Sequence, residues 1–145
     1  MGNNFNPRNA ARALARRLAV QALYSWQINA VPWQDLEATF MADPEMPKAD
    51  ADYFRALMRT AVEQHAELDE ALAPFLTVPP GGLDPVERAV LLVAACELRG
   101  QPQTPLRVVI AENTGIARRF GATDGHKLVN AVLDRAARAW RPDER

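Results

Sequence analysis

The stretch DPVERAVLLVAACEL, residues 84–98, predicts the helix around which the fold is built. Asp84 can cap this helix, Pro85 suits its first turn, and Glu87 can reach back to the N–H of the capping residue. From Ala89 to Cys96 the side chains are apolar on nearly every face. Because a helix that is apolar all round is buried, we expect this segment at the centre of a bundle.

Capping residues, prolines and apolar residues spaced three and four apart predict further helices on both sides of this segment. An Asn-Pro pair at 6–7 begins the first helix, Gly121 is a good C-terminal cap, and Thr123 or Asp124 caps the last helix. A Pro-Pro-Gly-Gly break at 79–82 separates the two halves of the chain. The expected helical segments besides the central one are 7–29, 33–40, 49–65, 68–76, 104–120 and 124–141.

No strand alternation and no internal repeat is visible, so the chain predicts an all-α bundle of about seven helices. Its 145 residues, 48% hydrophobic and 24% charged, fit one globular domain over residues 1–145. Residues 1–9 are expected to form a flexible N-terminal arm and residues 143–145 a flexible tail. The longest apolar run is too short to span a bilayer. The N-terminus lacks an apolar signal core, so we expect a cytoplasmic protein that does not contact membranes.

The residue types that carry catalysis are scarce in this chain. It contains one serine, one cysteine and two histidines. Cys96 lies in the most apolar segment, and the histidines form no metal-binding motif. A glycine-rich phosphate-binding loop is absent, and a single cysteine excludes an internal disulfide. We therefore expect a non-catalytic binding protein with no cofactor and no metal.

The net charge of −1 hides an uneven distribution of charge along the chain. Residues 1–30 carry four arginines and no acid, residues 31–100 carry 13 acids and five bases, and residues 101–145 carry eight bases and five acids. Basic ends around an acidic middle indicate two surfaces for different partners. Fifteen of the 17 bases are arginine, which stacks on nucleobases and binds phosphate through two N–H groups. A genome rich in arginine codons explains the same bias.

The first helix offers the best candidate binding surface. At about 100° per residue, the side chains of Arg16, Arg17, Val20 and Tyr24 face away from the apolar side of the helix. An exposed tyrosine beside two arginines can stack a base and hold a phosphate, and the same pattern fits a solvated surface without a ligand. In the first turn of the last helix, Lys127 lies beside free backbone N–H groups that attract phosphate.

Six stretches of the chain match one family, in order and with few differences in length. They are AVQALYSWQ at 19–27, D-x-x-Y-F at 50–54, VERAVL at 86–91, EL at 97–98, TPLRVVIAE at 104–112 and RRFGATDGHKLVNAVLD at 118–134. Together they resemble the NusB family of bacterial transcription antitermination factors over about residues 10–142. The resemblance implies an all-α, NusB-like fold of two small three- to four-helix sub-bundles, and no catalytic activity.

The resemblance also implies binding partners. Members of the family bind the boxA element of ribosomal RNA leaders together with NusE, a small-subunit ribosomal protein. They do so in a complex of RNA polymerase with NusA and NusG. By this resemblance Glu87 is expected to bind NusE, and RNA is expected to contact the first helix and the start of the last one. The expected RNA-binding residues are Arg12, Arg16, Arg17, Tyr24, Asp124, Lys127 and Leu128.

The chain departs from the family pattern at several positions. Leu92 stands where an arginine is usual, Cys96 and Leu128 replace aromatic residues, and Gly115 should cost its helix about 1 kcal/mol. Two other hypotheses stay open. One is a NusB-like scaffold for protein interactions without RNA affinity, and the other is the RNA-binding domain type found in RNA cytosine methyltransferases.

Overall fold

Helix α5, Pro85–Gly100, lies at the centre of the structure, a computed structural model that describes residues 6–144. Within these residues there are seven α-helices, three short 3₁₀ turns and no strand, which confirms the all-α prediction. The other α-helices are α1 (Pro7–Ile28), α2 (Trp33–Met41), α3 (Ala51–Glu63), α4 (His65–Leu72), α6 (Leu106–Phe120) and α7 (Gly125–Trp140). The 3₁₀ turns are Met46–Lys48, Ala73–Phe75 and Pro80–Gly82.

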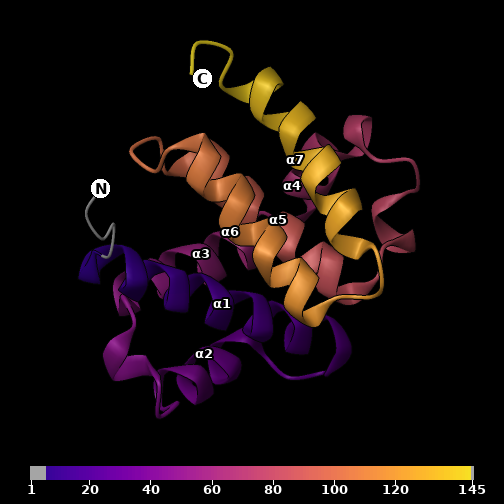
Figure 1. The fold of residues 1–145 in the computed structure, drawn as a ribbon. Helices are drawn as coiled ribbons and strands as arrows, with labels where there is room; N and C mark the ends of the chain where they lie inside the picture. The colour runs from indigo at the N-terminus through magenta and orange to yellow at the C-terminus, as the bar shows by residue number, and fades with distance from the viewer. Residues whose placement is uncertain (1–5, 145) are drawn as a thin grey trace.

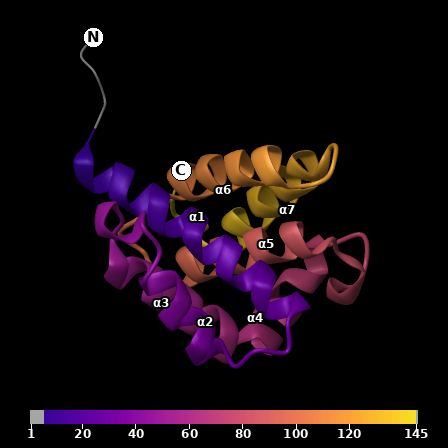
Figure 2. The ribbon, with the colours of Figure 1, turned by 90° about the horizontal axis from the view of Figure 1, so that it is seen from below.

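The helices form two groups around α5. Helices α1, α2 and α3 lie together on one side, and α6 and α7 pack against each other on the other (Figures 1 and 2). Helix α5 contacts α1, α3, α4, α6 and α7. The apolar helix therefore occupies the central position that its sequence predicts.

Capping side chains satisfy the free N–H groups at the start of three helices. For α1 and α5 these are the caps expected from the sequence, and both predicted helix starts are confirmed. Asn6 accepts a hydrogen bond from the N–H of Arg8 at 2.9 Å, Asp50 from Tyr53 at 3.0 Å, and Asp84 from Val86 at 2.8 Å.

Several helix ends differ from those that the sequence predicts. The helix expected over residues 49–65 ends at Glu63, and a separate helix begins at His65. The helix expected over residues 104–120 begins at Leu106, and the carboxylate of Glu144 accepts the hydrogen bond of the Leu106 N–H at 2.7 Å. Glu144 belongs to the expected flexible tail. Of the expected flexible arm, residues 7–9 lie in α1, while residues 1–5, like residue 145, lie outside the described residues.

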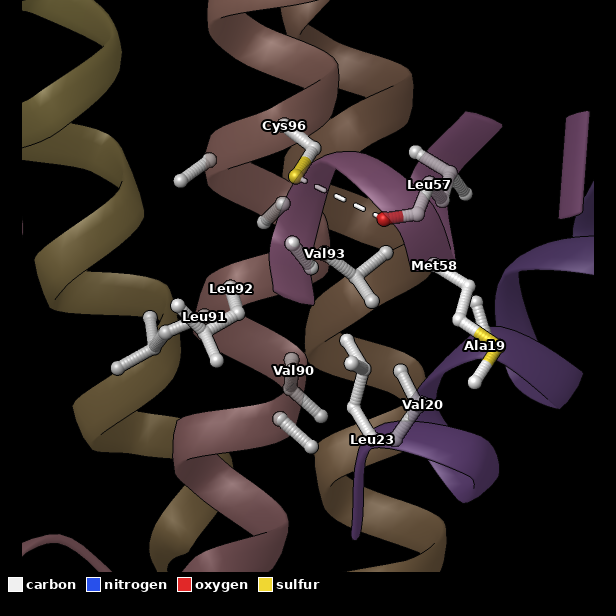
Figure 3. Packing of buried hydrophobic residues seen from close by; sticks show 14 of the residues in the cluster. Ala19, Val20, Leu23, Leu57, Met58, Val90, Leu91, Leu92, Val93 and Cys96 are labelled. Carbon is white, nitrogen blue, oxygen red and sulfur yellow. Dashed lines mark hydrogen bonds between the residues drawn. The ribbon is translucent and has the colours of Figure 1, made fainter. Parts of the chain in front are cut away.

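The core consists of aliphatic side chains that surround α5. Every side chain from Ala89 to Leu98 is buried, including Leu92, where the family pattern has an arginine. The Sγ of Cys96 points toward the carbonyl oxygen of Leu57, 3.9 Å away (Figure 3). Burial raises the pKa of the Cys96 thiol to about 12. The thiol therefore stays protonated and packs as a small hydrophobic group.

One ion pair lies inside this core. Arg16 donates through Nε and Nη2 to the two carboxylate oxygens of Glu97 at 2.8 and 2.7 Å, and both side chains are almost completely buried. The Tyr53 hydroxyl and the Asn113 amide donate to the same carboxylate at 2.6 and 2.9 Å. Burial and the nearby Glu97 carboxylate raise the pKa of Tyr53 to about 12, so its hydroxyl remains a donor. The network joins α1, α3, α5 and α6.

The prediction that Arg16 and Val20 face solvent is wrong, since they are 2% and 3% exposed. Helix α1 packs against both α3 and α5, so its buried surface is wider than one apolar stripe. A guanidinium can be buried there because Glu97 supplies a carboxylate that uses two of its N–H groups. Of the four residues expected on the outer face, Tyr24 is exposed and Arg17 is partly exposed.

Loss of the buried cation should be costly. Arg16→Met leaves the Glu97 carboxylate buried without its cation, so we expect the free energy of unfolding to fall by about 3–5 kcal/mol. Arg17→Met is the matched control, because Arg17 pairs with the exposed carboxylate of Glu45, and it should cost no more than about 1 kcal/mol. Denaturant unfolding of both variants measures the difference, and equal losses would contradict the structural role given to the buried pair.

Candidate nucleic-acid interface

The outer face of α1 presents the cationic and aromatic side chains expected from the sequence, apart from Arg16. The guanidinium of Arg12 lies over the ring of Tyr53, 5.0 Å from its centroid, and its Nε is 3.6 Å from a carboxylate oxygen of Asp50. Arg17 donates to Glu45 at 2.6 Å. Tyr24, two turns further on, is 40% exposed. An exposed aromatic ring thus follows two arginines along one helix, and each of these arginines is paired with an acid.

The start of α7 forms a second exposed patch. Asp124 has a φ of 65°, in the left-handed region, and its side chain does not cap the helix. Its carboxylate instead lies 3.3 Å from the Nζ of Lys127, and both side chains are exposed. Leu128 is half-buried and packs against the hydrophobic core. The prediction of a side-chain cap at Asp124 is therefore wrong, because the left-handed backbone turns its carboxylate toward Lys127 instead of the free N–H groups.

Glu87 does not form the expected capping box. Its side chain is 5% exposed, and its Oε2 accepts a hydrogen bond from the N–H of Ala122 at 3.3 Å, in the turn between α6 and α7. The turn fits closely around this carboxylate. A Cβ added at Gly121 would lie 2.5 Å from Oε2 of Glu87, and one added at Gly125 would lie 2.9 Å from the same atom. Glu87 thus holds the turn in place, and Asp84 caps α5 without it.

The pKa of Glu87 is raised above its ordinary value. The main cause is burial, and the negative charge of Asp84 adds to it, while the hydrogen bond from Ala122 acts in the opposite direction. A raised pKa in the folded state means that ionisation of this carboxyl lowers stability. Its favourable contribution is complete below the unfolded-state pKa and is lost as pH rises through the folded-state pKa.

An apolar hollow connects the outer face of α1 with the start of α5. Tyr24 and Phe120 both line it, are both about two-fifths exposed, and face it from different helices. Val86, the neighbour of Glu87, lines it as well. The structure thus brings Tyr24 close to the turn that Glu87 holds. Within residues 6–144, no hydrogen bond or ion pair joins Arg12 or Arg17 to Asp124 or Lys127.

Sequence reasoning missed Glu97 and Phe120. A single carboxylate in a helix that is otherwise apolar on every face requires a buried cation. This rule could have identified the arginines of the first helix as candidate partners of Glu97. Phe120 was expected only to end its helix. No pattern in the sequence places its ring beside Tyr24, because the two residues lie on separate helices.

No group of three or more histidine, cysteine or acidic side chains among residues 6–144 could hold a metal ion. In the same part of the chain, no helix is both long enough and apolar enough to cross a membrane.

The fold and this surface define a small all-helical binding protein. The model of the NusB family matches residues 13–138. The transcription antitermination protein NusB of Idiomarina loihiensis is 47% identical over 133 residues, which cover 92% of this chain and 96% of that protein. The chain belongs to the NusB family, whose members are non-catalytic transcription antitermination factors.

Solved structures share the same fold. NusB of T. maritima has a TM-score of 0.75 and 26% identity, over 88% of this chain and 90% of that one. A chain in the crystal structure of the antitermination factors NusB and NusE in complex with double-stranded RNA has a TM-score of 0.79 and 24% identity. That match covers 88% of this chain and 96% of the other. These likenesses confirm the NusB-like arrangement of helices.

Glu87 allows a test of how the turn is held. Glu87→Gln keeps an oxygen that can accept the Ala122 N–H and removes the buried charge, so it should be at least as stable as the wild type at about pH 7. Because the pKa of Glu87 is raised, wild-type stability should fall relative to the Gln variant as pH rises from about 4 to 7. Glu87→Ala removes the acceptor and should cost about 1–3 kcal/mol. Denaturant unfolding at several pH values distinguishes these outcomes, and a Gln variant as unstable as the Ala variant would contradict them.

Proposed function

We propose that this chain is a transcription antitermination factor that binds boxA RNA of ribosomal RNA leaders together with NusE. It would act in the cytoplasm on RNA polymerase, in a complex with NusA and NusG. Family membership supports the proposal, and so does the fold shared with a NusB that was crystallised with NusE and RNA. The observation that carries the RNA-binding part is the outer face of α1, where two arginines precede an exposed tyrosine.

The RNA surface proposed here differs from the expected one at one residue. Arg12 and Arg17 contact phosphates, and the ring of Tyr24 stacks on a base. Arg16 has no direct contact with RNA, because its guanidinium is buried against Glu97. Its role is to position α1. At the start of α7, the proposed contacts are Asp124, Lys127 and the exposed edge of Leu128.

All three cations proposed to bind phosphate are already paired with acids of the same chain. Arg12 lies near Asp50, Arg17 near Glu45 and Lys127 near Asp124. Each phosphate contact must displace a carboxylate, so RNA affinity should be weak for the protein alone and stronger when NusE adds its own contacts. These pairs also favour the second candidate function, a scaffold without RNA affinity. The family match favours an antitermination factor over a methyltransferase domain.

We place NusE on the side of the apolar hollow that Val86 and Phe120 line, opposite the Tyr24 ring that stacks on RNA. The hollow is next to Glu87, the residue expected to take part in this contact. Partly exposed aromatic rings in a hollow are the kind of group that dominates binding energy at interfaces. The acidic middle of the chain, residues 31–100, complements a basic ribosomal protein. In this proposal Glu87 acts on NusE binding indirectly, by holding the turn beside the hollow.

The RNA-binding role is tested by measuring the affinity for boxA RNA and for a scrambled RNA at several salt concentrations, with and without NusE. Arg12→Gln, Arg17→Gln and Lys127→Gln should each weaken binding and flatten the log–log salt slope by about 0.7. Arg138→Gln is the matched control, since Arg138 is also paired with an acid on the surface, and it should leave the slope unchanged. Glu45→Gln should strengthen binding up to about fivefold by freeing Arg17. NusE binding without any preference for boxA RNA would indicate the scaffold instead.

The partner surface is tested by titration calorimetry against NusE. Phe120→Ala removes an aromatic ring from the hollow and should weaken the complex about tenfold or more. Val78→Ala removes a side chain of similar exposure outside the hollow and should leave the Kd unchanged. Glu87→Gln should also change the Kd little, because the carboxylate is buried and Gln still accepts the Ala122 N–H. An unchanged Kd for Phe120→Ala would exclude this hollow as the NusE site.

A further inference from the structure

Helices α1 and α6 are neighbours that cross each other (Figures 1 and 2), and hollows lie between them. Two hollows follow each other. The first is lined by the beginnings of both helices, and the second by their middle parts. Both are lined by Ala13 and Glu112, so they are continuous and form one α1–α6 groove. The side chains that line it and matter here are Arg8, Arg12 and Arg17 from α1, and Glu112, Gly115 and Arg119 from α6.

Both helices contribute arginines to the groove. Arg8 and Arg12 line the first hollow from α1, and the second hollow is lined by Arg17 from α1 and Arg119 from α6. The one carboxylate lining it, Glu112, lies 3.6 Å from the Nη1 of the buried Arg16. A strand of phosphates is the ligand whose charge matches such a surface.

Arg119 differs from the three cations of the proposed RNA surface. No carboxylate among residues 6–144 lies within ion-pair distance of it, whereas Arg12, Arg17 and Lys127 each have an acid partner. Its guanidinium lies over the ring of Phe120, 4.8 Å from the centroid. It is exposed and can bind phosphate without displacing a carboxylate of this chain. It lies in the last turn of α6, shortly before the start of α7, and lines one hollow together with Arg17.

Gly115 leaves the middle of the groove open. It lies within α6, where glycine is unfavourable, and a Cβ added there would meet nothing within 4 Å. Its φ is not positive, so neither backbone conformation nor packing requires glycine. Its effect on the surface is to leave space between Arg17 and Arg119, where a sugar-phosphate backbone can approach the helix closely.

We propose that α6 forms the second side of the RNA site in this chain. A single-stranded RNA lies in the α1–α6 groove, passes over Gly115, and has its phosphates held between Arg17 and Arg119. This inference rests on the proposed RNA-binding function and adds to it the path of the strand and two residues of α6. The part of the apolar hollow lined by Val86 and Phe120 remains available for NusE.

The groove is tested with boxA RNA, with and without NusE, by two pairs of variants. Arg119→Gln should weaken binding about three- to tenfold and flatten the salt slope by about 0.7, whereas the neighbouring Arg118→Gln should change affinity less than twofold. Gly115→Glu places a carboxylate in the groove and should weaken binding at least tenfold. Gly100→Glu makes the same change at another exposed helical glycine with open space around it, outside the groove, and should change affinity less than twofold.

Further variants separate the possible outcomes. Gly115→Ala should be at least as stable as the wild type, which shows that the helix tolerates a side chain at this position and that a loss of affinity in Gly115→Glu does not come from unfolding. If Arg119→Gln and Gly115→Glu bind RNA like the wild type while Arg12→Gln and Lys127→Gln bind it weakly, the α6 side of the site is refuted and the proposed function stands. If the wild type shows no preference for boxA RNA with or without NusE, both are refuted.

Discussion

The buried pair of Arg16 and Glu97 is the interaction on which the arrangement of the helices depends. A carboxylate in the most apolar helix of the chain would be unstable without a cation, and the first helix supplies that cation across 81 positions of sequence. Tyr53 and Asn113 provide the remaining donors, so the network sets the position of α3 and α6 as well. The proposed RNA contacts therefore lie on helices that this network holds. Helices α1 and α6 belong to the network, and α7 packs against α5 and α6, which also belong to it.

This arrangement separates structural cations from cations that are available to ligands. The guanidinium of Arg16 is committed to Glu97, while Arg12 and Arg17, on the same helix, are held by carboxylates that remain partly open to solvent. The partly exposed ion pairs of Arg12 and Arg17 contribute little to stability. They do lower the charge that an approaching phosphate meets, so the net charge of the whole chain describes the proposed RNA surface poorly. An arginine such as Arg119, which has no acid partner among residues 6–144, can then contribute as much to binding as a paired one that lies closer to the centre of the patch.

Local signals in the sequence were sufficient for much of the fold. Asn6 and Asp84 act within two residues of themselves, and the apolar run of α5 needs no knowledge of its neighbours to be placed inside. The candidate site was harder to predict for a physical reason. The spacing along α1 gives the direction of Arg16 relative to Leu18, but it does not say how many helices pack around α1. The capping-box prediction for Glu87 was wrong for the same reason, because the N–H group that its carboxylate binds lies 35 residues away, in the turn between α6 and α7. Contacts between distant segments decide which polar side chains are buried, and no local pattern contains them.

The turn between α6 and α7 joins residues of both proposed surfaces. On one side of it Phe120 lines the apolar hollow and Arg119 lines the groove. On the other side Asp124 and Lys127 begin α7, and the Glu87 carboxylate fills the space between Gly121 and Gly125. A bulky side chain at either glycine must displace Glu87, and a displaced Glu87 releases Ala122. A substitution in this turn therefore moves residues of both proposed surfaces together, so a loss of RNA affinity or of NusE affinity alone does not assign a contact. Only substitutions of exposed side chains that leave the turn in place, such as those at Arg119 and Lys127, report on direct binding.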